Sequence, residues 1–161
     1  MTQPSRLAIV PFVSVDRMMK LVLTIGVERF LTELAAYIEE DFRRWELFDK
    51  TPRIASHSHD GVIELMPTSD GKMYGFKYVN GHPKNMAHGL QTVTAFGLLA
   101  EVSTGYPVLL TEMTLLTALR TAAAGVIAAE TLGRREGSTA VVGLGVNGAE
   151  RPLTLRHDRP N

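Results

Sequence analysis

The pattern of apolar and polar residues predicts two helices early in the chain. Between Val27 and Phe48, apolar residues recur at three- and four-residue spacing, which is typical of an amphipathic helix. The apolar positions are Val27, Phe30, Leu31, Leu34, Ile38, Phe42 and Trp45. A shorter helix is expected to begin near Ser14 or Asp16 and to end at Gly26. Its apolar side is supplied by Met18, Met19, Leu21 and Val22, and we interpret these stripes as core.

The middle of the chain has the alternating pattern of antiparallel strands. Strands are predicted over residues 53–58, 62–66, 72–80, 91–102 and 106–111, after a short first strand over 9–15 that Pro11 interrupts. Asp60-Gly61, Asp70-Gly71 and Ser103-Thr-Gly105 lie between neighbouring strands and have the composition of hairpin turns. A third helix is predicted over 113–132, with Gly133 just past its end. The predicted class is α+β, with helices packed on an antiparallel sheet.

The last part of the chain predicts the start of a second domain. Gly133-Arg-Arg-Glu-Gly137 has the composition of a linker, and residues 138–142 form a buried type of strand. That strand runs into Gly143-Leu-Gly145-Val-Asn-Gly148, a GxGxxG motif directly after a strand, as in dinucleotide-binding Rossmann units. Pro152 follows closely and no helical period appears after it. We therefore expect a domain over 1–132, and over 133–161 only the first strand and glycine loop of a Rossmann domain.

Composition narrows the class of protein. The chain has 161 residues, 45% of them hydrophobic, and 17 basic residues balance 17 acidic ones. This balance gives no electrostatic footprint for nucleic acid. The absence of cysteine excludes disulfides and thiolate metal sites. No apolar run reaches the roughly 18–20 residues of a membrane span, so no membrane partner is expected and the protein is expected to be cytoplasmic.

Four charged residues interrupt otherwise apolar segments and are the candidates for chemistry. Arg53, Glu64 and Lys77 fall on predicted strands, and Arg120 falls on the apolar surface of the third predicted helix. Burying such charges is costly unless each has a partner. A small zwitterion such as an amino acid would satisfy them, if Glu64 and Lys77 face the same side of the sheet. Structural ion pairs, including one between Glu64 and Lys77, explain the same pattern.

Other kinds of catalytic site have weaker support in the sequence. His57 and His59 have the spacing of two metal ligands on one strand face, but a third ligand at clear spacing is missing, so no metal site is expected. A serine hydrolase is disfavoured because the chain contains no GxSxG motif.

Seven stretches of this sequence resemble the ornithine cyclodeaminase/mu-crystallin family. The resemblance extends from Phe12 to about Glu130. The stretches are Glu39-Glu-Asp-Phe-Arg-Arg-Trp45, Phe48-Asp-Lys50, Arg53-Ile-Ala-Ser-His-Ser58, Gly61-Val-Ile-Glu-Leu-Met-Pro67, Phe76-Lys-Tyr-Val-Asn-Gly-His-Pro83, Gly105-Tyr-Pro-Val-Leu-Leu110 and Thr117-Ala-Leu-Arg-Thr121. The glycine loop departs from the family's Gly-x-Gly-Ala-Gln-Ser, and no resemblance is noted after it. The resemblance therefore implies a fragment, truncated or frameshifted within the Rossmann domain.

The resemblance implies a fold and a reaction. The family combines a substrate-binding domain that forms a homodimer with a Rossmann domain that binds NAD. The implied reaction converts L-ornithine to L-proline and ammonia: NAD⁺ accepts a hydride from the α-carbon, the δ-amino group replaces the α-nitrogen, and the hydride returns to the cyclic imine. An NAD(P)H-dependent ketimine reductase of the same family, and a non-catalytic dimerising fragment that binds an amino acid, are the alternatives. Without the rest of the second domain, we expect this chain alone to be inactive.

The resemblance also implies roles for individual residues. Arg53, Lys77 and Arg120 match the positions that grip the substrate carboxylate. Glu64 matches the carboxylate that faces the substrate amino end, and with Lys77 it is the candidate catalytic residue. The cofactor-binding positions implied for NAD are Thr92, Thr121, Gly143, Gly145 and Gly148.

Overall fold

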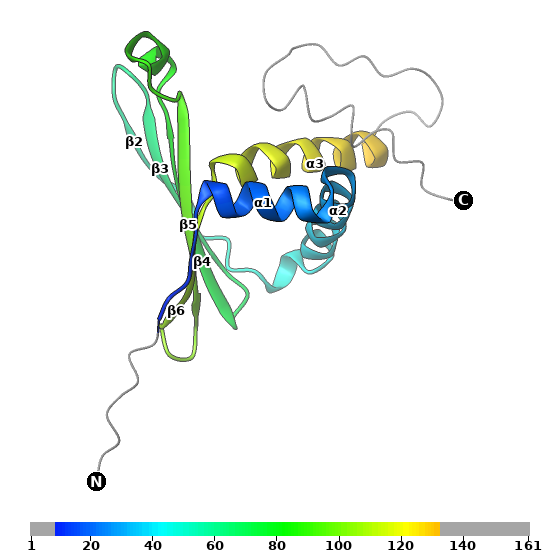
Figure 1. The fold of residues 1–161 in the computed structure, drawn as a ribbon. Helices are drawn as coiled ribbons and strands as arrows, with labels where there is room; N and C mark the ends of the chain where they lie inside the picture. The colour runs from blue at the N-terminus through cyan, green and yellow to red at the C-terminus, as the bar shows by residue number, and fades with distance from the viewer. Residues whose placement is uncertain (1–8, 133–161) are drawn as a thin grey trace. The chain divides into compact units, whose positions relative to one another are not determined.

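The computed structural model describes residues 9–132, which form two compact units (Figure 1). One unit contains residues 9–14 and Asp49–Glu112 and is built around a β-sheet. The other contains Val15–Phe48 and residues 113–132 and is helical. Helices together with a mainly antiparallel sheet confirm the expected α+β class. The expected division into 1–132 and 133–161 stays a prediction, because 133–161 lie outside the described residues.

The sheet has six strands in the order β1-β6-β5-β4-β3-β2. Their bounds are β1 Phe12–Val13, β2 Ile54–His57, β3 Val62–Ser69, β4 Met73–Gly81, β5 Val93–Glu101 and β6 Pro107–Glu112. Strands β2 to β6 form the predicted antiparallel meander. The sheet is nevertheless mixed, because β1 pairs with β6 in parallel. The predicted first strand over 9–15 shrinks to two residues after Pro11, since proline has no backbone N–H to donate to a ladder.

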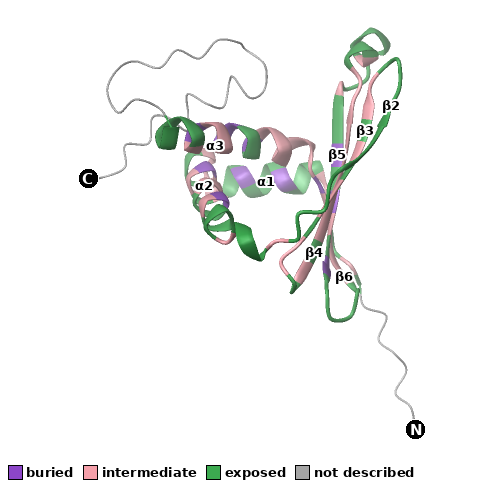
Figure 2. Cartoon of the chain, turned by 180° about the vertical axis from the view of Figure 1, so that it is seen from behind, coloured by how far each residue is buried: buried purple, intermediate pink, exposed green. Residues whose placement is uncertain are grey.

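The register of the strands gives the sheet one strongly apolar face. Successive side chains of a strand point to opposite faces, and directly paired residues share a face. The apolar residues on this face include Ile54, Ile63, Leu65, Pro67, Tyr74, Phe76, Tyr78, Phe96 and Leu98, and the polar residues Ser56, Ser69, Asn80, Thr94 and Glu112 share it. The ring of Phe96 stacks on Tyr78 with centroids 5.0 Å apart and meets Phe76 edge-on at 6.3 Å. Several of these residues are exposed, among them Leu65 and Phe96. Figure 2 colours the chain by burial.

Short polar turns connect the strands. Between β3 and β4, the Asp70 carboxylate accepts the backbone N–H groups of Lys72 at 3.0 Å and Met73 at 2.8 Å, which confirms the predicted turn. The connection from β4 to β5 contains a 3₁₀ helix, η2 (Pro83–His88), which the sequence pattern did not predict. Pro83 at its start is favourable because the first N–H groups of a helix lack internal partners.

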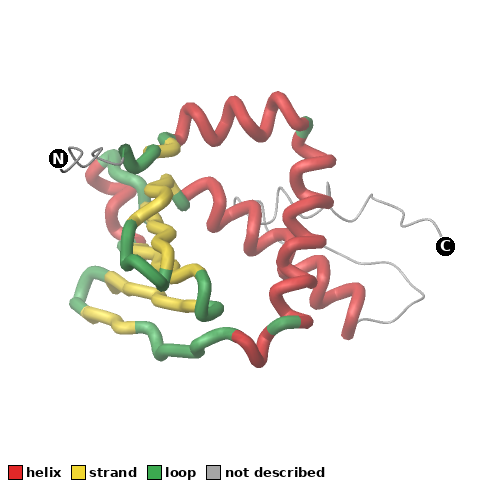
Figure 3. Tube along the Cα trace, turned by 90° about the horizontal axis from the view of Figure 1, so that it is seen from below, coloured by secondary structure: helices red, strands yellow, loops and turns green. Residues whose placement is uncertain are grey.

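The helical unit contains three α-helices, drawn in red in Figure 3. They are α1 (Val15–Ile25), α2 (Val27–Arg43) and α3 (Thr114–Leu132), and the 3₁₀ helix η1 (Trp45–Leu47) follows α2. Gly26 separates α1 from α2 with φ of 92°, a left-handed value that glycine adopts without steric cost. The second predicted helix, expected over Val27–Phe48, ends five residues earlier, at Arg43.

Fewer residues of this unit are buried than the apolar stripes predicted. The buried residues are Met18 and Val22 of α1, Leu31 and Ile38 of α2, and Leu119, Ala122, Ala123 and Val126 of α3. Phe42 and Trp45, predicted as core, are about half exposed and contact each other with ring centroids 6.0 Å apart. Met19 and Leu21, assigned to the apolar side of α1, are also exposed. Adjacent positions on a helix point in different directions, so only part of each stripe is buried.

Helix α3 corrects one expectation about membranes. An 18-residue window within its 19 residues has a mean hydropathy of 1.3, so by length and composition the helix could cross a bilayer, although no such run was expected. A core helix of a soluble domain meets the same criteria. In α3, Leu119, Ala122, Ala123 and Val126 are buried, whereas Arg120 lies between them in sequence and is exposed.

Candidate functional site

Glu64 and Lys77 lie on the same face of the sheet, as the amino-acid-site hypothesis required. Glu64 of β3 is paired with Val79 of β4, and Met66 is paired with Lys77. Glu64 and Lys77 are therefore diagonal neighbours, with an expected separation of about 7–8 Å between their backbones. We call this side the charged face; it lies opposite the apolar face defined by Leu65 and its neighbours. Both side chains are half-buried.

Arg53 joins this charged face through an ion pair. It immediately precedes β2, and its Nη1 donates a hydrogen bond to Oε1 of Glu64 at 3.1 Å. The Arg53 side chain is 61% exposed and that of Glu64 only 20%. Glu64 thus forms an ion pair with Arg53. Arg53 is also exposed, not buried as its apolar sequence context suggested.

Arg120 and Thr121 belong to the helical unit. Arg120 is exposed and forms no ion pair within the part of the chain that the structure describes, so the cost of burial that drew attention to it does not arise. The hydroxyl of Thr121 donates to the carbonyl oxygen of Thr117 at 2.6 Å, one helical turn earlier. Its oxygen lone pairs remain able to accept a hydrogen bond from a ligand.

Thr92 holds the base of the loop between β4 and β5. Its carbonyl oxygen accepts the backbone N–H of His82 at 2.8 Å. The side-chain oxygen of Asn80 accepts both the backbone N–H of Thr94 at 2.6 Å and its hydroxyl at 2.7 Å. These bonds give Thr92 a fixed position directly before β5. The other implied cofactor residues, Gly143, Gly145 and Gly148, lie outside the described residues.

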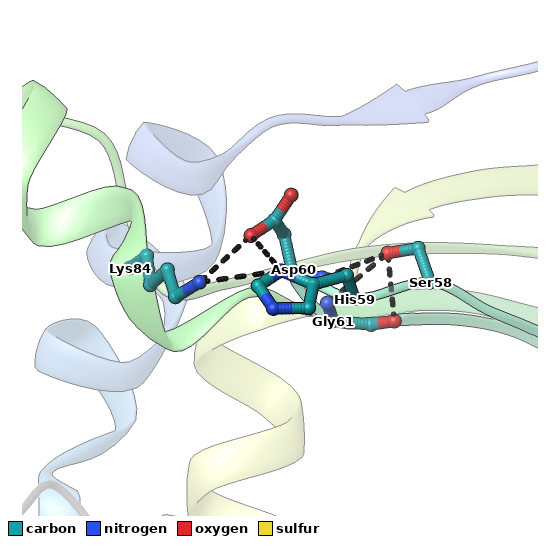
Figure 4. A network of polar contacts seen from close by, with 5 residues as sticks. All are labelled: Ser58, His59, Asp60, Gly61 and Lys84. Atoms are coloured by element: carbon teal, nitrogen blue, oxygen red, sulfur yellow. Dashed lines mark hydrogen bonds and ion pairs between the residues drawn. The ribbon is translucent and has the colours of Figure 1, made fainter.

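A second polar cluster lies at the tip of the β2–β3 hairpin (Figure 4). Oδ1 of Asp60 is 3.0 Å from Nζ of Lys84 on η2 and 3.1 Å from Nδ1 of His59. The Ser58 hydroxyl accepts the N–H of Gly61 at 3.1 Å and donates to its carbonyl oxygen. This cluster links the hairpin to a loop more than twenty residues away, a contact that the sequence pattern does not predict.

The charges in this cluster explain the one carboxyl pKa shift resolved among the described residues. The hydrogen bond from Lys84 lowers the pKa of Asp60 below its ordinary value, and the contact with His59 lowers it further. The side chains are well exposed, so water weakens each of these interactions. We interpret the cluster as a structural contact that holds the two loops together.

The hypothesis of a histidine metal site gains no support from the geometry. His57 ends β2, whereas His59 lies in the following turn and contacts Asp60. Within residues 9–132, no group of three or more His, Cys, Asp or Glu side chains could hold a metal ion. A surface hollow does occur on α1, but its lining residues are Asp16, Met19, Lys20, Leu23 and Thr24, none of which was a candidate.

The charged face can bind a ligand that carries charges of both signs. Arg53 and Lys77 offer N–H donors to a carboxylate, and a guanidinium suits carboxylate geometry well. Glu64, held by β3, offers a carboxylate to an ammonium group. The three side chains come from the residue just before β2 and from the next two strands of the sheet, β3 and β4, so the meander itself brings them together.

Comparison with known proteins gives a family match over most of the chain. The model of the "Ornithine cyclodeaminase/mu-crystallin family" matches residues 15–159. The match continues past Glu130, where the resemblance was expected to stop, and includes the glycine loop. A protein of Brucella abortus biovar 1 named "Ornithine cyclodeaminase" is 67% identical over 157 residues. That alignment covers 97% of this chain and 44% of the relative, so the chain spans less than half of the relative's length.

Solved structures share the fold. An archaeal alanine dehydrogenase dimer with bound NAD superposes with a TM-score of 0.80 at 31% identity, covering 91% of this chain and 45% of that one. Thermococcus litoralis Δ1-pyrroline-2-carboxylate reductase, solved with NADH and L-proline, gives a TM-score of 0.73 at 28% identity. It covers 89% of this chain and 45% of the reductase.

Proposed function

The chain belongs to the ornithine cyclodeaminase/mu-crystallin family, and from this premise we propose that it is the substrate-binding part of an ornithine cyclodeaminase. The proposed reaction converts L-ornithine to L-proline and ammonia. The observation that carries the proposal is the group of Arg53, Glu64 and Lys77 on one face of the sheet, which suits an amino acid with a carboxylate at one end and an ammonium at the other. The 67% identical Brucella relative supports the choice of ornithine.

In this proposal each charged residue of the face has a role. Arg53 and Lys77 bind the substrate carboxylate, and the role that the resemblance implies for Arg120 of α3 stays a prediction. Glu64 accepts a hydrogen bond from the substrate amino end and orients it, so that the nitrogen that closes the ring approaches the α-carbon. Fixing this geometry lowers the entropic part of the barrier. Glu64 is also the candidate for accepting a proton from that amino group, because an amine must lose its proton before it attacks.

NAD is the proposed cofactor, and when bound it supplies the hydride acceptor and donor of the reaction. Among the described residues, Thr92 and Thr121 have oxygen atoms able to accept hydrogen bonds, and we propose both as contacts to NAD. The phosphate cradle is proposed at Gly143, Gly145 and Gly148. The described residues alone lack the strand, glycine loop and helix of a dinucleotide site, so the roles proposed for Arg53, Glu64 and Lys77 concern the substrate only.

We also propose that the family's homodimer is formed through the apolar face of the sheet. Leu65 and Phe96 are 41% and 42% exposed in the single chain, and both are paired with Tyr78 on this face, Leu65 also with Ile54. An exposed apolar surface of this kind is typical of a protein interface. The alanine dehydrogenase with the same fold is described as a dimer. The proposed setting is the cytoplasm, without nucleic acid or membrane partners.

The test measures proline and ammonia formed from L-ornithine with NAD. Two proteins are compared: the 161-residue chain, and the same chain continued to the length of the Brucella relative. We expect the longer protein, but not the 161-residue chain, to form proline at a substantial rate, because the chain spans 44% of that relative. Δ1-Pyrroline-2-carboxylate with NADH is the second substrate pair, since the Thermococcus reductase favours a ketimine reductase as the alternative. Reduction of that imine without any turnover of ornithine would establish the alternative.

A further inference from the structure

In the proposed function, Arg53 binds the carboxylate of the ligand and Glu64 binds its ammonium group. In the structure these two residues form an ion pair with each other. Without ligand they satisfy each other, with Nη1 and Oε1 3.1 Å apart. We propose that an amino acid opens this ion pair by exchange. The ligand carboxylate replaces Glu64 as the partner of Arg53, and a ligand ammonium replaces Arg53 as the partner of Glu64. This inference rests on the proposed function and adds a rule for which ligands bind.

The positions of the two residues favour exchange over a permanent contact. Glu64 lies within β3, which is paired with β2 on one side and β4 on the other, so its backbone is fixed. Arg53 lies just outside β2, at the edge of the sheet, and its side chain is mostly exposed. An arginine in this position can swing away without breaking a strand pairing. Lys77, diagonal to Glu64 on the same face, provides the second cation for an incoming carboxylate.

The energetic cost of opening is small for the right ligand and unfavourable for the wrong one. An exposed ion pair contributes little to stability, so breaking it costs little. A ligand with both charges restores a partner to each residue. A ligand with only a carboxylate pairs with Arg53 but leaves the half-buried Glu64 without its cation, and a ligand with only ammonium groups leaves Arg53 without its anion. The pair thus selects ligands that carry both charges.

The exchange predicts that two substitutions increase the affinity for ligands of opposite charge. Glu64→Gln frees Arg53, so a plain carboxylate should bind more tightly while ornithine binds less tightly. Arg53→Gln frees Glu64, so a plain diamine should bind more tightly while ornithine again binds less tightly. The gain for a single-ended ligand should reach about fivefold at most, because it equals the release of one exposed ion pair.

The experiment uses three ligands of matched chain length: L-ornithine, pentanoate and 1,4-diaminobutane. Each is titrated into the ¹⁵N-labelled 161-residue chain, with dissociation constants taken from amide shifts near Arg53 and Glu64. Wild type, Glu64→Gln and Arg53→Gln are compared. Arg29→Gln is the control, since it removes a similarly short exposed ion pair, Arg29 with Glu33 on α2, that lies outside the site. It should leave all three affinities unchanged.

Tighter pentanoate binding to Glu64→Gln and tighter diaminobutane binding to Arg53→Gln support the exchange. A gain in affinity cannot arise from misfolding, so neither result depends on the variants being as stable as wild type. Binding of ornithine to wild type without either gain overturns the exchange but leaves the proposed substrate intact. Absence of ornithine binding to wild type overturns the proposed substrate, and the exchange with it.

Discussion

Gly61 lies where the β2–β3 hairpin passes closest to the end of β4. A Cβ atom at this position would meet the carbonyl oxygen of Gly81 and would come within 2.8–2.9 Å of the His82 ring. Real Cβ atoms do not approach backbone this closely, so the chain must shift to accept a side chain. We expect Gly61→Ala to lower the free energy of unfolding by about 1–3 kcal/mol, as overpacking does elsewhere. Urea unfolding followed by circular dichroism measures the change.

Gly81→Ala is the matched control for that substitution. A Cβ there meets only Cγ1 of Val62, at an ordinary 3.6 Å, and the backbone φ of Gly81 is not positive. Replacing such a glycine reduces the freedom of the unfolded chain, so the change should lie between zero and a gain of about 1 kcal/mol. Equal losses for the two variants would contradict the close approach at Gly61.

Asp60 gives the fold a predicted dependence on pH. Lys84 first, and then His59, lower the pKa of the folded carboxyl below its ordinary value of 3.8. A lowered folded pKa means that the ionised form stabilises the fold above the unfolded pKa, and that this stabilisation is lost as pH falls through the folded pKa. Asp60→Asn should therefore melt slightly below wild type at pH 5–7, and the difference should disappear at lower pH.

Thermal melting of wild type, Asp60→Asn and Lys84→Met between pH 7 and 2 measures this dependence. His59 and His82 also face the carboxyl, and both lower its pKa, as Lys84 does. Lys84→Met should remove most of the pH dependence that Asp60 gives to the melting temperature. A difference between wild type and Asp60→Asn that stayed constant down to pH 2 would show that the carboxylate charge is not involved.

For single residues, the candidate site could be predicted where it depends on strand alternation. Alternation and hairpin register place Glu64 and Lys77 on one face, and the structure has them there. The ion pair of Glu64 with Arg53 was missed because Arg53 precedes its strand, where alternation gives no direction for a side chain. Burial of Arg53 and Arg120 was wrongly expected, because apolar neighbours in sequence need not surround a residue in space.

Among the elements, strands β4 and β5 are tied together by an aromatic group on the apolar face. Phe96 of β5 stacks on Tyr78 and meets Phe76 edge-on, both on β4. Truncation of a fully buried phenylalanine costs about 3–5 kcal/mol, and Phe96 keeps 42% exposure, so we expect Phe96→Ala to cost about 1–3 kcal/mol. Urea unfolding of dilute protein, where self-association is absent, measures this loss.

Phe42→Ala on α2 serves as the comparison. Phe42 is 53% exposed and contacts Trp45 with ring centroids 6.0 Å apart. With one aromatic neighbour instead of two and greater exposure, its truncation should cost less than that of Phe96. A larger loss for Phe42 would mean that the stripe predicted from the sequence is core after all.

The elements themselves were largely predictable, because their signals are local. The five strands from β2 to β6 and all three helices appear where periodicity and turn residues placed them. The parallel pairing of β1 with β6 was not predictable, since it joins Phe12 to Leu110, almost a hundred positions away. Helix η2 was missed because its six residues are too few to show a helical period.

For the whole molecule, the glycine loop shows what a motif can and cannot predict. Gly143, Gly145 and Gly148 follow a strand-like run, and the family match to residue 159 includes them. The motif alone predicts a backbone that can approach a pyrophosphate. It says nothing of the helix and second strand that complete a Rossmann unit. The chain spans 44% of the Brucella relative, so NAD binding at this loop stays a proposal.

The proposed homodimer gives the last prediction, and it depends on the apolar face as a whole. Leu65 lies near the middle of that face, paired with Ile54 on one side and Tyr78 on the other. If a second copy covers this face, Leu65→Lys buries an ammonium group among apolar side chains. A buried unpaired charge costs a few kcal/mol, so self-association should weaken by about 100-fold or more.

Sedimentation velocity over a range of concentrations measures the association of wild type and variant. Thr68→Lys is the control, because Thr68 is an exposed residue of the same strand on the opposite face. It adds the same charge to β3 and should leave the dimer intact. Dissociation of both variants would assign the effect to net charge, and persistence of the Leu65→Lys dimer would place the interface elsewhere. Loss of the dimer in Leu65→Lys alone, with unchanged circular dichroism, is what covering of the apolar face requires.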